Sequence, residues 1–276
     1  MRFDIRHVTT YRYDKPVALG RHLFRMRPRP DGTLTPGTFS IAVYPPPLGL
    51  APMLDLEGNL THLAWFEGET QELRITVRST GETSTRAKLL ADPETLQLPI
   101  DYGHDQTKMF PYLWSDGTDP QVEEFSRSLA RESDRQTFTF LDLLTTRLHE
   151  TIRNTPRLTG HPFAPEVTLR ERRGSCRDFA VLFMACCRLQ GLAARFVSGY
   201  VPADAGDKQH MHAWAEVYLP GIGWQAYDPT HGGVTGERHV PVAAAAQSVD
   251  AGPVVGSFTG YAQSEMAVQL TVDIGG

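Results

Sequence analysis

The stretch that decides the fold is Arg173-Gly-Ser-Cys-Arg-Asp-Phe-Ala180. Gly174 and Ser175 break the preceding pattern, and apolar residues then recur at helical spacing as far as Leu189, where a glycine two residues later marks the stop. The pattern predicts a helix that begins at Ser175 or Cys176 and buries its apolar face. Cys176 is therefore expected in the first turn of a packed helix.

Three short segments typical of β-strands follow this helix, at about 195–201, 212–219 and 224–227. Glycines at 221 and 223 mark a tight turn between the last two segments. In the middle segment His212, Trp214 and Glu216 share one face, and apolar residues occupy the other. These features predict an antiparallel sheet packed on the cysteine-bearing helix, with Asp228 at the end of its last strand.

Cys, His and Asp thus occur in an order that suits nucleophilic catalysis. The free N–H groups at a helix N-terminus favour the thiolate of Cys176, and they offer donors for an oxyanion. His212 is expected to exchange a proton with Cys176 across the junction between helix and sheet, while Asp228 orients the imidazole. Gly174 permits the close backbone approach that such a site needs.

The motifs around this trio contain further candidates for binding or supporting roles, namely Gly174, Ser175, Asp178, Trp214 and Glu216. For Asp178 and Glu216 a supporting role at the site and an exposed or arginine-paired role are equally open. Trp214 is expected mainly to pack. Cys186 and Cys187 lie inside the apolar stretch of the helix, so we expect them to be core residues without a redox role.

The rest of the chain predicts an α+β protein. Up to about residue 80, short runs such as 40–44 and 72–78 alternate apolar and polar residues between turn-forming breaks, which favours an antiparallel β-sandwich or barrel. Helices are expected from Asp119-Pro120 onward and over 140–154. Beyond Asp228 the pattern is irregular, with little information over 240–246, until a final strand at 266–274. We therefore expect a β-rich domain at 1–90, a connecting segment at 91–118, and a catalytic domain at 119–276 that includes the C-terminal strand.

Composition narrows the class of protein. The 276 residues carry a net charge of −5, with 41% hydrophobic and 21% charged residues, which is typical of a soluble protein and disfavours a nucleic-acid partner. Charges in the first seven residues interrupt any signal-peptide pattern, and no apolar run predicts a membrane span. The three cysteines do not form a disulfide framework. We expect a cytoplasmic protein with no membrane partner; the sequence leaves its oligomeric state open.

The histidines offer a different enzymatic interpretation. His210 and His212 form a His-x-His pair on one strand face, and His231 or His239 could complete a metal site. The chain contains ten histidines, so such pairs arise by chance, and His212 already has a role in the trio. We therefore expect neither a metal nor a cofactor.

Together these motifs resemble those of bacterial transglutaminase-like proteins, members of the papain-like superfamily that includes transglutaminases, peptide N-glycanases and several cysteine proteases. The resemblance rests on residues 174–180, Gly191-Leu-Ala-Ala-Arg195, Ser198-Gly-Tyr200, His212-Ala-Trp-Ala-Glu216, and Gly223-Trp224 leading to Asp228-Pro229. It extends to the β-rich domain that precedes the catalytic domain in many bacterial members, through Tyr11-Arg-Tyr-Asp-Lys-Pro16, Arg27-Pro28 and Asp55-Leu-Glu-Gly-Asn59.

The resemblance implies a papain-like core in which Cys176 is the nucleophile, His212 the general base and acid, and Asp228 the orienting carboxylate. It implies a peptide or protein substrate whose peptide, isopeptide or glutamine amide is attacked to form an acyl-enzyme. Hydrolysis is favoured for the bacterial branch, and transfer to an amine is the alternative. Arg177 stands where protein-crosslinking animal members carry an aromatic residue, and the chain has no loop with calcium-ligand spacing, so their calcium activation is not carried over. A non-catalytic peptide-binding module that has kept the fold is the alternative of another class.

Overall fold

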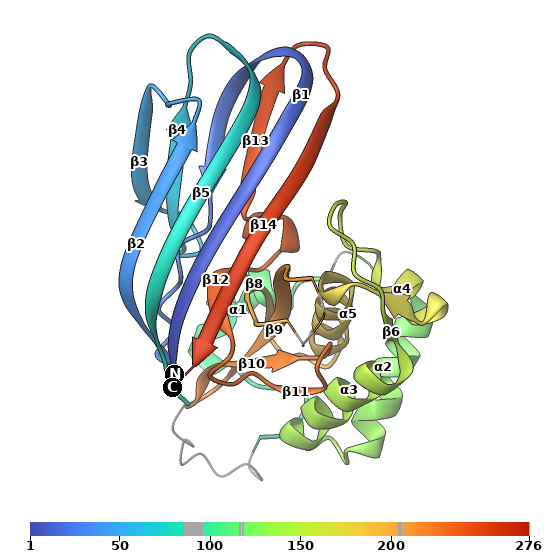
Figure 1. The fold of residues 1–276 in the computed structure, drawn as a ribbon. Helices are drawn as coiled ribbons and strands as arrows, with labels where there is room; N and C mark the ends of the chain where they lie inside the picture. The colour runs from blue at the N-terminus through green and yellow to red at the C-terminus, as the bar shows by residue number, and fades with distance from the viewer. Residues whose placement is uncertain (86–95, 116, 118, 204–205, 207, 276) are drawn as a thin grey trace.

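The computed structural model describes residues 1–85, 96–115, 117, 119–203, 206 and 208–275. Within these residues the strands form a large antiparallel sheet, a smaller antiparallel sheet and a two-stranded parallel pair. Figure 1 shows the large sheet extending away from the smaller sheet and the helices. The fold is α+β, as the sequence predicts, with a curled N-terminal sheet joined to a core of helices and sheet. No helix in the described ranges is long and apolar enough to cross a membrane.

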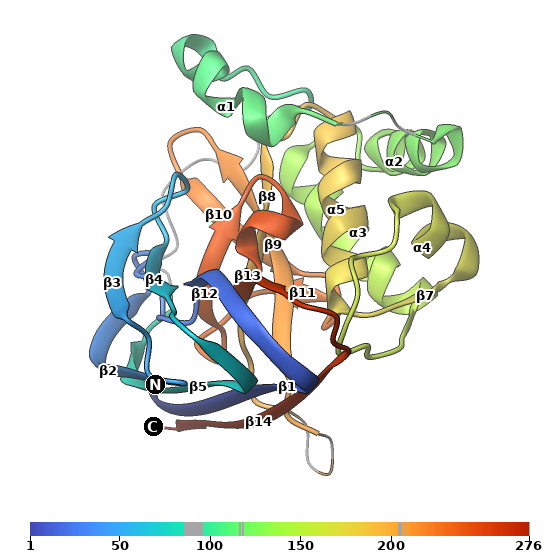
Figure 2. The same cartoon turned by 90° about the horizontal axis from the view of Figure 1, so that it is seen from above.

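The large sheet is built around one long strand, β1 (Arg2–Phe24), whose first half alternates exposed and buried residues. Five of its seven strands follow the order β2-β5-β1-β4-β3, and the other two, which come late in the chain, pair with β1. The other strands are β2 (Leu34–Tyr44), β3 (Gly49–Leu54), β4 (Leu60–Trp65), β5 (Glu69–Thr83), β13 (Val254–Thr259) and β14 (Ser264–Gly275). The two ends of the chain lie side by side in Figures 1 and 2, where Arg2 pairs with Gly275.

The C-terminal strand belongs to this large sheet, which corrects its expected place in the catalytic domain. The expected strand at 266–274 is present as part of β14, but it pairs with β1 from Arg2 opposite Gly275 to Tyr13 opposite Ser264. β13 continues the pairing further along β1. Alternation of apolar and polar residues indicates that a segment is a strand, but it does not specify the partner strand. The other domain boundaries stay predictions.

The smaller sheet has the order β11-β10-β9-β8-β12. Its strands are β8 (Ala194–Tyr200), β9 (Met211–Leu219), β10 (Gly223–Asp228), β11 (Gly233–Val234) and β12 (Val240–Ala245). The three strands expected between residues 195 and 227 are confirmed, including the hairpin of β9 and β10. β12 was not expected, since every one of its residues is buried and its sequence therefore lacks alternation.

The helix that begins at Cys176, α5 (Cys176–Leu189), lies in the middle of the core, between the smaller sheet and a group of helices (Figure 2). That group comprises α2 (Pro120–Glu132), α3 (Thr137–Thr151) and α4 (Pro165–Glu171). The remaining described elements are α1 (Gln106–Leu113), short 3₁₀ turns at Gly103–Asp105 and Ser248–Ala251, and the pair β6 (Arg153–Asn154) with β7 (Arg173–Gly174). α2 begins as predicted, because the Asp119 carboxylate accepts a hydrogen bond of 2.8 Å from the backbone of Gln121. The face of β9 that carries Ala213 and Ala215 packs in the same core as α5.

The large sheet packs directly on the smaller one. Phe3 and Ile5 of β1 share a buried apolar cluster with Tyr200 at the end of β8 and with β12. His7 Nδ1 forms a buried hydrogen bond of 3.0 Å with the Tyr200 hydroxyl, and burial lowers the pKa of His7 to about 4. The turn at 55–59 also contacts β12, because the Asn59 side chain exchanges two hydrogen bonds with the backbone of Ala244. The sheet that carries His212 is therefore held from its far side by the first strands of the chain.

Candidate active site

Cys176 is the first residue of α5, and it is partly exposed at the end of a helix that is largely buried. Ser175 precedes it in an extended conformation as the N-cap. A Cβ atom on Gly174 would lie 2.8 Å from the Cβ of Asp178, so only glycine fits this approach. Cys186 and Cys187 are fully buried, and burial raises the pKa of both thiols. Among the three cysteines, only Cys176 is placed to react with a molecule in solution.

Asp178 holds the start of the helix together. Its side chain is fully buried and accepts hydrogen bonds from the Ser175 backbone at 2.6 Å and from the Ser175 hydroxyl at 2.8 Å. Arg157 Nη2 lies 2.7 and 2.9 Å from the two carboxylate oxygens, and the Phe163 backbone donates at 2.7 Å. Burial disfavours the charged carboxylate, but these donors outweigh it and keep the pKa of Asp178 below its usual range. Of the two roles left open for Asp178, the arginine-paired role is the one in the structure, and it supports the residues beside Cys176.

These bonds tie the segment 155–164 to the nucleophile. Arg157 also lies over the Phe163 ring, 3.9 Å from its centroid, and Arg177 donates to the backbone carbonyls of Arg157 and Thr159. The segment displays Leu158, which is 54% exposed, beside the start of α5. Its contacts with Arg177 and Asp178 hold it next to the first turn of α5.

His212 lies at the beginning of β9 and connects the nucleophile to the carboxylate. Its Nε2 atom is 2.7 Å from Asp228 Oδ2, and the side chain lies beside Cys176, which contributes to its raised pKa. Since the imidazole has only two nitrogens, Nδ1 is the atom that faces the sulfur. Burial disfavours the imidazolium, but Asp228 and Cys176 outweigh it and raise the pKa of His212 to about 10. Near neutral pH the imidazole of His212 is therefore protonated.

Asp228 accepts hydrogen bonds from three histidines through a single oxygen. Besides His212, His231 Nδ1 lies 2.7 Å and His239 Nε2 lies 3.0 Å from Oδ2. Because an ionised carboxylate only accepts hydrogen bonds, each of these nitrogens carries a proton. For His239 a second contact supports a proton on Nε2, since its Nδ1 accepts a hydrogen bond of 3.2 Å from the Gly236 backbone and so carries no proton. Burial opposes ionisation of Asp228, yet the three imidazoles hold its pKa well below the usual value.

The second oxygen of Asp228 is held by the local turn. Oδ1 accepts from the backbone of Thr230 at 3.0 Å and from the backbone of His231 at 3.3 Å. This is the hydrogen-bonding pattern that an Asp-Pro turn provides. The carboxylate is 1% exposed and is fixed at both oxygens, so it presents Oδ2 to His212 in one orientation.

The side chains of His212, Asp228 and His231 also form a group whose donor atoms all lie within 4.8 Å of one another. Donor atoms around a tetrahedral zinc ion are about 3.3 Å apart, given its usual bond lengths. Here each of the two histidine nitrogens lies 2.7 Å from the same carboxylate oxygen. The atoms thus surround Oδ2 and not a common centre, and this geometry fits hydrogen bonding better than metal ligation. His210 is not part of the group.

Two candidates on the same strand face as His212 serve other purposes. Glu216 is buried and bonded to Arg195, with Nη2 at 2.5 Å and Nε at 2.6 Å, so the arginine-paired role is the one in the structure. Trp214 is fully buried and packs against Val197 and Ala244. Its ring also meets His239 edge to face, with centroids 5.3 Å apart. Trp214 therefore packs, as expected, and holds His239 toward Asp228.

Sequence reasoning did not assign His231 and His239 to the Asp228 carboxylate, and it did not find Arg157 as the partner of Asp178. His231 follows Asp228 by three residues in a turn, which is a local signal that could have indicated the contact. His239 reaches Asp228 from eleven residues away, and Arg157 reaches Asp178 from twenty-one. Neither separation corresponds to a periodicity of helix or strand, so the sequence held no signal for them.

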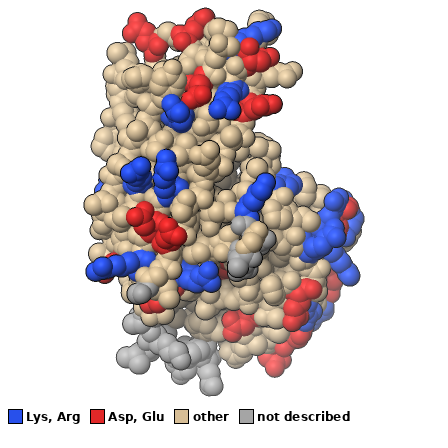
Figure 3. All heavy atoms as spheres, viewed as in Figure 1, with Lys and Arg blue, Asp and Glu red and all other residues tan. Residues whose placement is uncertain are grey.

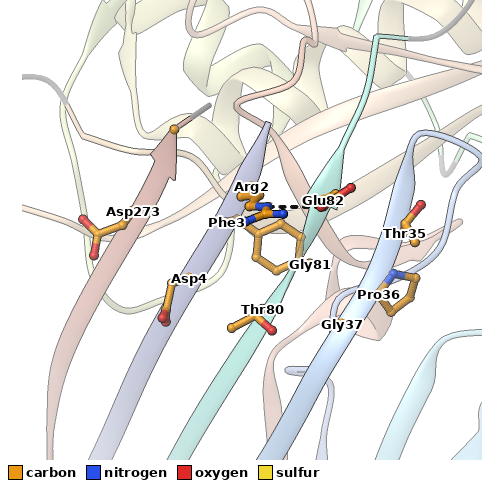
Figure 4. A pocket seen from close by; sticks show the side chains of 11 residues that line it. Arg2, Phe3, Asp4, Thr35, Pro36, Gly37, Thr80, Gly81, Glu82 and Asp273 are labelled. Atoms are coloured by element: carbon orange, nitrogen blue, oxygen red, sulfur yellow. Dashed lines mark hydrogen bonds and ion pairs between the residues drawn. The ribbon is translucent and has the colours of Figure 1, made fainter.

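A large hollow lies elsewhere, at the end of the large sheet near the chain termini. Its volume is about 740 Å³, and β1, β2, β5 and β14 contribute its lining (Figure 4). Arg2 and Glu82 form an exposed ion pair of 3.2 Å at this hollow. None of the residues predicted for the site lines it, so Cys176, His212 and Asp228 lie in a different part of the molecule.

Comparisons with known proteins agree with this arrangement. The family model for the transglutaminase-like superfamily matches residues 124–229, which include Cys176, His212 and Asp228. The model for the bacterial transglutaminase-like N-terminal region matches residues 3–82. An uncharacterized protein of Mycobacterium tuberculosis is 36% identical over 118 residues, which cover 38% of this chain and 37% of that protein. An uncharacterized protein of Mycobacterium leprae is 30% identical over 110 residues, 38% of this chain and 39% of that protein.

The matched segment thus spans little more than a third of the length of these curated relatives. Among solved structures, one described as a "Putative Cysteine Protease from Cytophaga hutchinsonii" aligns over 99% of this chain and 90% of that chain, with a TM-score of 0.72 and 23% identity. This likeness shows that the two share a fold. With both family regions matched in sequence order, the chain belongs to the transglutaminase-like superfamily and combines a bacterial transglutaminase-like N-terminal region with a transglutaminase-like core.

Proposed function

We propose that this protein is a thiol-dependent enzyme that attacks amide bonds through an acyl-enzyme and releases the acyl group to water. The observation that carries the proposal is the arrangement at the N-terminus of α5, where His212 lies beside Cys176 and its Nε2 atom is hydrogen bonded to Asp228. Each group has the environment that its role needs: a partly exposed sulfur, a protonated imidazole beside it, and a buried, fixed carboxylate. The proposed substrate is a peptide, isopeptide or glutamine amide.

In the first half-reaction the Cys176 thiolate forms a bond to the carbonyl carbon of the amide, and the carbonyl π electrons move to oxygen. The Asp178 N–H group is engaged by Ser175, but those of Cys176 and Arg177, the first two of α5, can donate to this oxyanion. The imidazolium of His212 then gives its Nδ1 proton to the departing nitrogen while the C–N bond breaks. An amine leaves, and a thioester with Cys176 and a neutral His212 remain.

In the second half-reaction neutral His212 takes a proton from water as its oxygen attacks the thioester carbon. Collapse of the intermediate breaks the C–S bond, releases a carboxylic acid and restores the thiolate with its imidazolium. Access of solvent supports this route, because Cys176 is partly exposed and the His231 side chain on the other side of Asp228 is 49% exposed. Attack by an amine in place of water would give transglutamination by the same steps.

The proposal is tested with peptide and glutamine-peptide libraries, incubated with wild type and Cys176→Ala, with and without a primary amine. Mass spectrometry of the products should show cleavage or deamidation in the wild type alone. Cys186→Ala is the matched control, since it removes a buried thiol and should keep turnover. Products that incorporate the amine would identify a transferase. Absence of turnover, together with a Cys176 that alkylates no faster than a model thiol below pH 7, would support the peptide-binding module.

A further inference from the structure

A strongly basic surface directly precedes the nucleophile in the chain. It consists of the exposed residues Arg153, Arg170, Arg172 and Arg173, which lie on α4, β6 and β7 and in the turn between α4 and β7. Figure 3 shows Lys and Arg side chains gathered on the flank where Figure 1 places α4 and β6. We call these four residues the basic surface.

The charges of this surface are largely unbalanced. Glu171 is shared by Arg170 at 3.5 Å and Arg173 at 3.9 Å. Within the described part of the chain, no ion pair is formed by Arg153 or Arg172. The exposed arginines of α2 differ, because Arg127 and Arg131 are paired with Glu123 and Glu124 at adjacent turns. The basic surface thus carries positive charge that the protein itself does not neutralise.

Two of its arginines are direct neighbours across a strand pair. Arg153 and Arg173 stand opposite each other in the parallel pair of β6 and β7. Backbone hydrogen bonds from Arg153 to Arg172 at 2.9 Å and from Thr155 to Gly174 at 2.7 Å fix this register. Like charges at directly opposite positions destabilise a strand pair, and bound carboxylates would offset this repulsion. The arrangement is therefore better suited to a protein with an anionic partner than to one without.

One residue of the basic surface, Arg173, lies within a short distance of Cys176. Arg173 precedes Cys176 by three residues, so their Cα atoms are separated by at most about 11 Å. The two intervening residues are held rigidly, because Asp178 binds both the backbone and the hydroxyl of Ser175. An extended peptide advances about 3.3 Å per residue. A substrate with its scissile amide at Cys176 therefore reaches the basic surface with side chains roughly three to five positions away.

We propose that the basic surface binds an acidic segment of the peptide substrate, with Asp or Glu carboxylates a few residues from the amide that Cys176 attacks. The substrate role rests on the proposed function, whereas the binding does not. All four basic groups are guanidinium groups, which bind carboxylates with paired, parallel hydrogen bonds. A short acidic segment fits this local surface, whereas a long polyanion would also meet the negative charge of the rest of the protein.

The test measures binding without turnover. A fluorescein-labelled peptide with six consecutive Glu residues is titrated with full-length Cys176→Ala, and its anisotropy is followed at low and at physiological salt. In this background, Arg153→Gln with Arg173→Gln should weaken binding about tenfold, since two carboxylate contacts are lost. Arg127→Gln with Arg131→Gln is the matched control, because it removes the same two charges from α2 and should change affinity less than about twofold.

Several outcomes would overturn the proposal: equal losses in both double variants, equal affinity for a peptide with six Gln residues, or tighter competition by a single-stranded oligonucleotide of the same charge. The last result would favour a nucleic-acid partner. Thermal unfolding of both double variants shows whether the fold is kept. Failure of the proposed enzymatic function appears separately, as slow alkylation of Cys176 in wild type while the acidic peptide still binds.

Discussion

Replacement of Asp228 by Asn removes the charge of the carboxylate and keeps its shape, so it isolates the contribution of that charge to the pair of His212 and Cys176. The pKa of His212 is raised from 6.5 to about 10, in spite of burial, by Asp228 and Cys176. At about 1.4 kcal/mol for each pH unit, this rise corresponds to roughly 5 kcal/mol. If half of it comes from Asp228, the substitution makes the imidazolium of His212, which favours a neighbouring thiolate, roughly 50-fold less stable relative to the neutral imidazole.

The assay is the rate of alkylation of Cys176 by iodoacetamide at pH 6, followed by intact-protein mass. Cys186 and Cys187 do not interfere, because both are completely buried. We expect wild type to react much faster than a model thiol, and Asp228→Asn to react at least about tenfold more slowly than wild type. Asp250→Asn, which changes an exposed carboxylate, is the control and should react as wild type does. A rate for Asp228→Asn within threefold of wild type would refute the inferred ion pair.

Three further predictions concern stability. Asp178→Asn should lower the free energy of unfolding by about 3 kcal/mol in urea titrations, because it leaves Arg157 without its buried partner. The control is Glu132→Gln, which changes an exposed ion pair and should change the free energy of unfolding by less than about 0.5 kcal/mol. Equal effects of the two substitutions would contradict this prediction. The pKa of His7 is about 4 in the folded chain, below its ordinary value of 6.5. Between pH 6.5 and 4 the unfolded chain therefore binds a proton at His7 that the folded chain does not, so the stability of the fold decreases as the pH falls through that range. Wild type should lose up to roughly 3 kcal/mol there, and His7→Gln should not; an unchanged pH dependence in the variant would show that other groups are responsible. Deletion of residues 264–275 should expose the edge of β1 and cause aggregation in size-exclusion chromatography, so a stable monomer with the wild-type Tm would argue against the role of β14.

Much of the candidate site could be predicted because its elements are encoded by neighbouring residues. A glycine and a serine before an apolar repeat of helical period specify a helix that begins at Cys176. Alternation over 212–219 and two glycines after it specify a strand and a tight hairpin, and this hairpin brings His212 and Asp228 together. The physical basis is local, since helix starts, strand faces and turns depend on side chains a few positions apart. The catalytic roles of the three residues stay predictions until the thiol is tested.

The tertiary structure decided the features that depend on distant partners. β14 joins β1 across nearly the whole chain, since an alternating strand can pair with any edge that buries its apolar face. β12 is a strand although its sequence does not alternate, because the large sheet covers it. His239 reaches Asp228, and Arg157 reaches Asp178, through partly buried hydrogen bonds that no periodicity of the sequence indicates. The sequence by itself pointed to Cys176 as the candidate nucleophile and to His212 and Asp228 as its candidate partners. Only the packing of the chain decided what holds them in place, because buried charges are stabilised by whichever donors the fold brings to them.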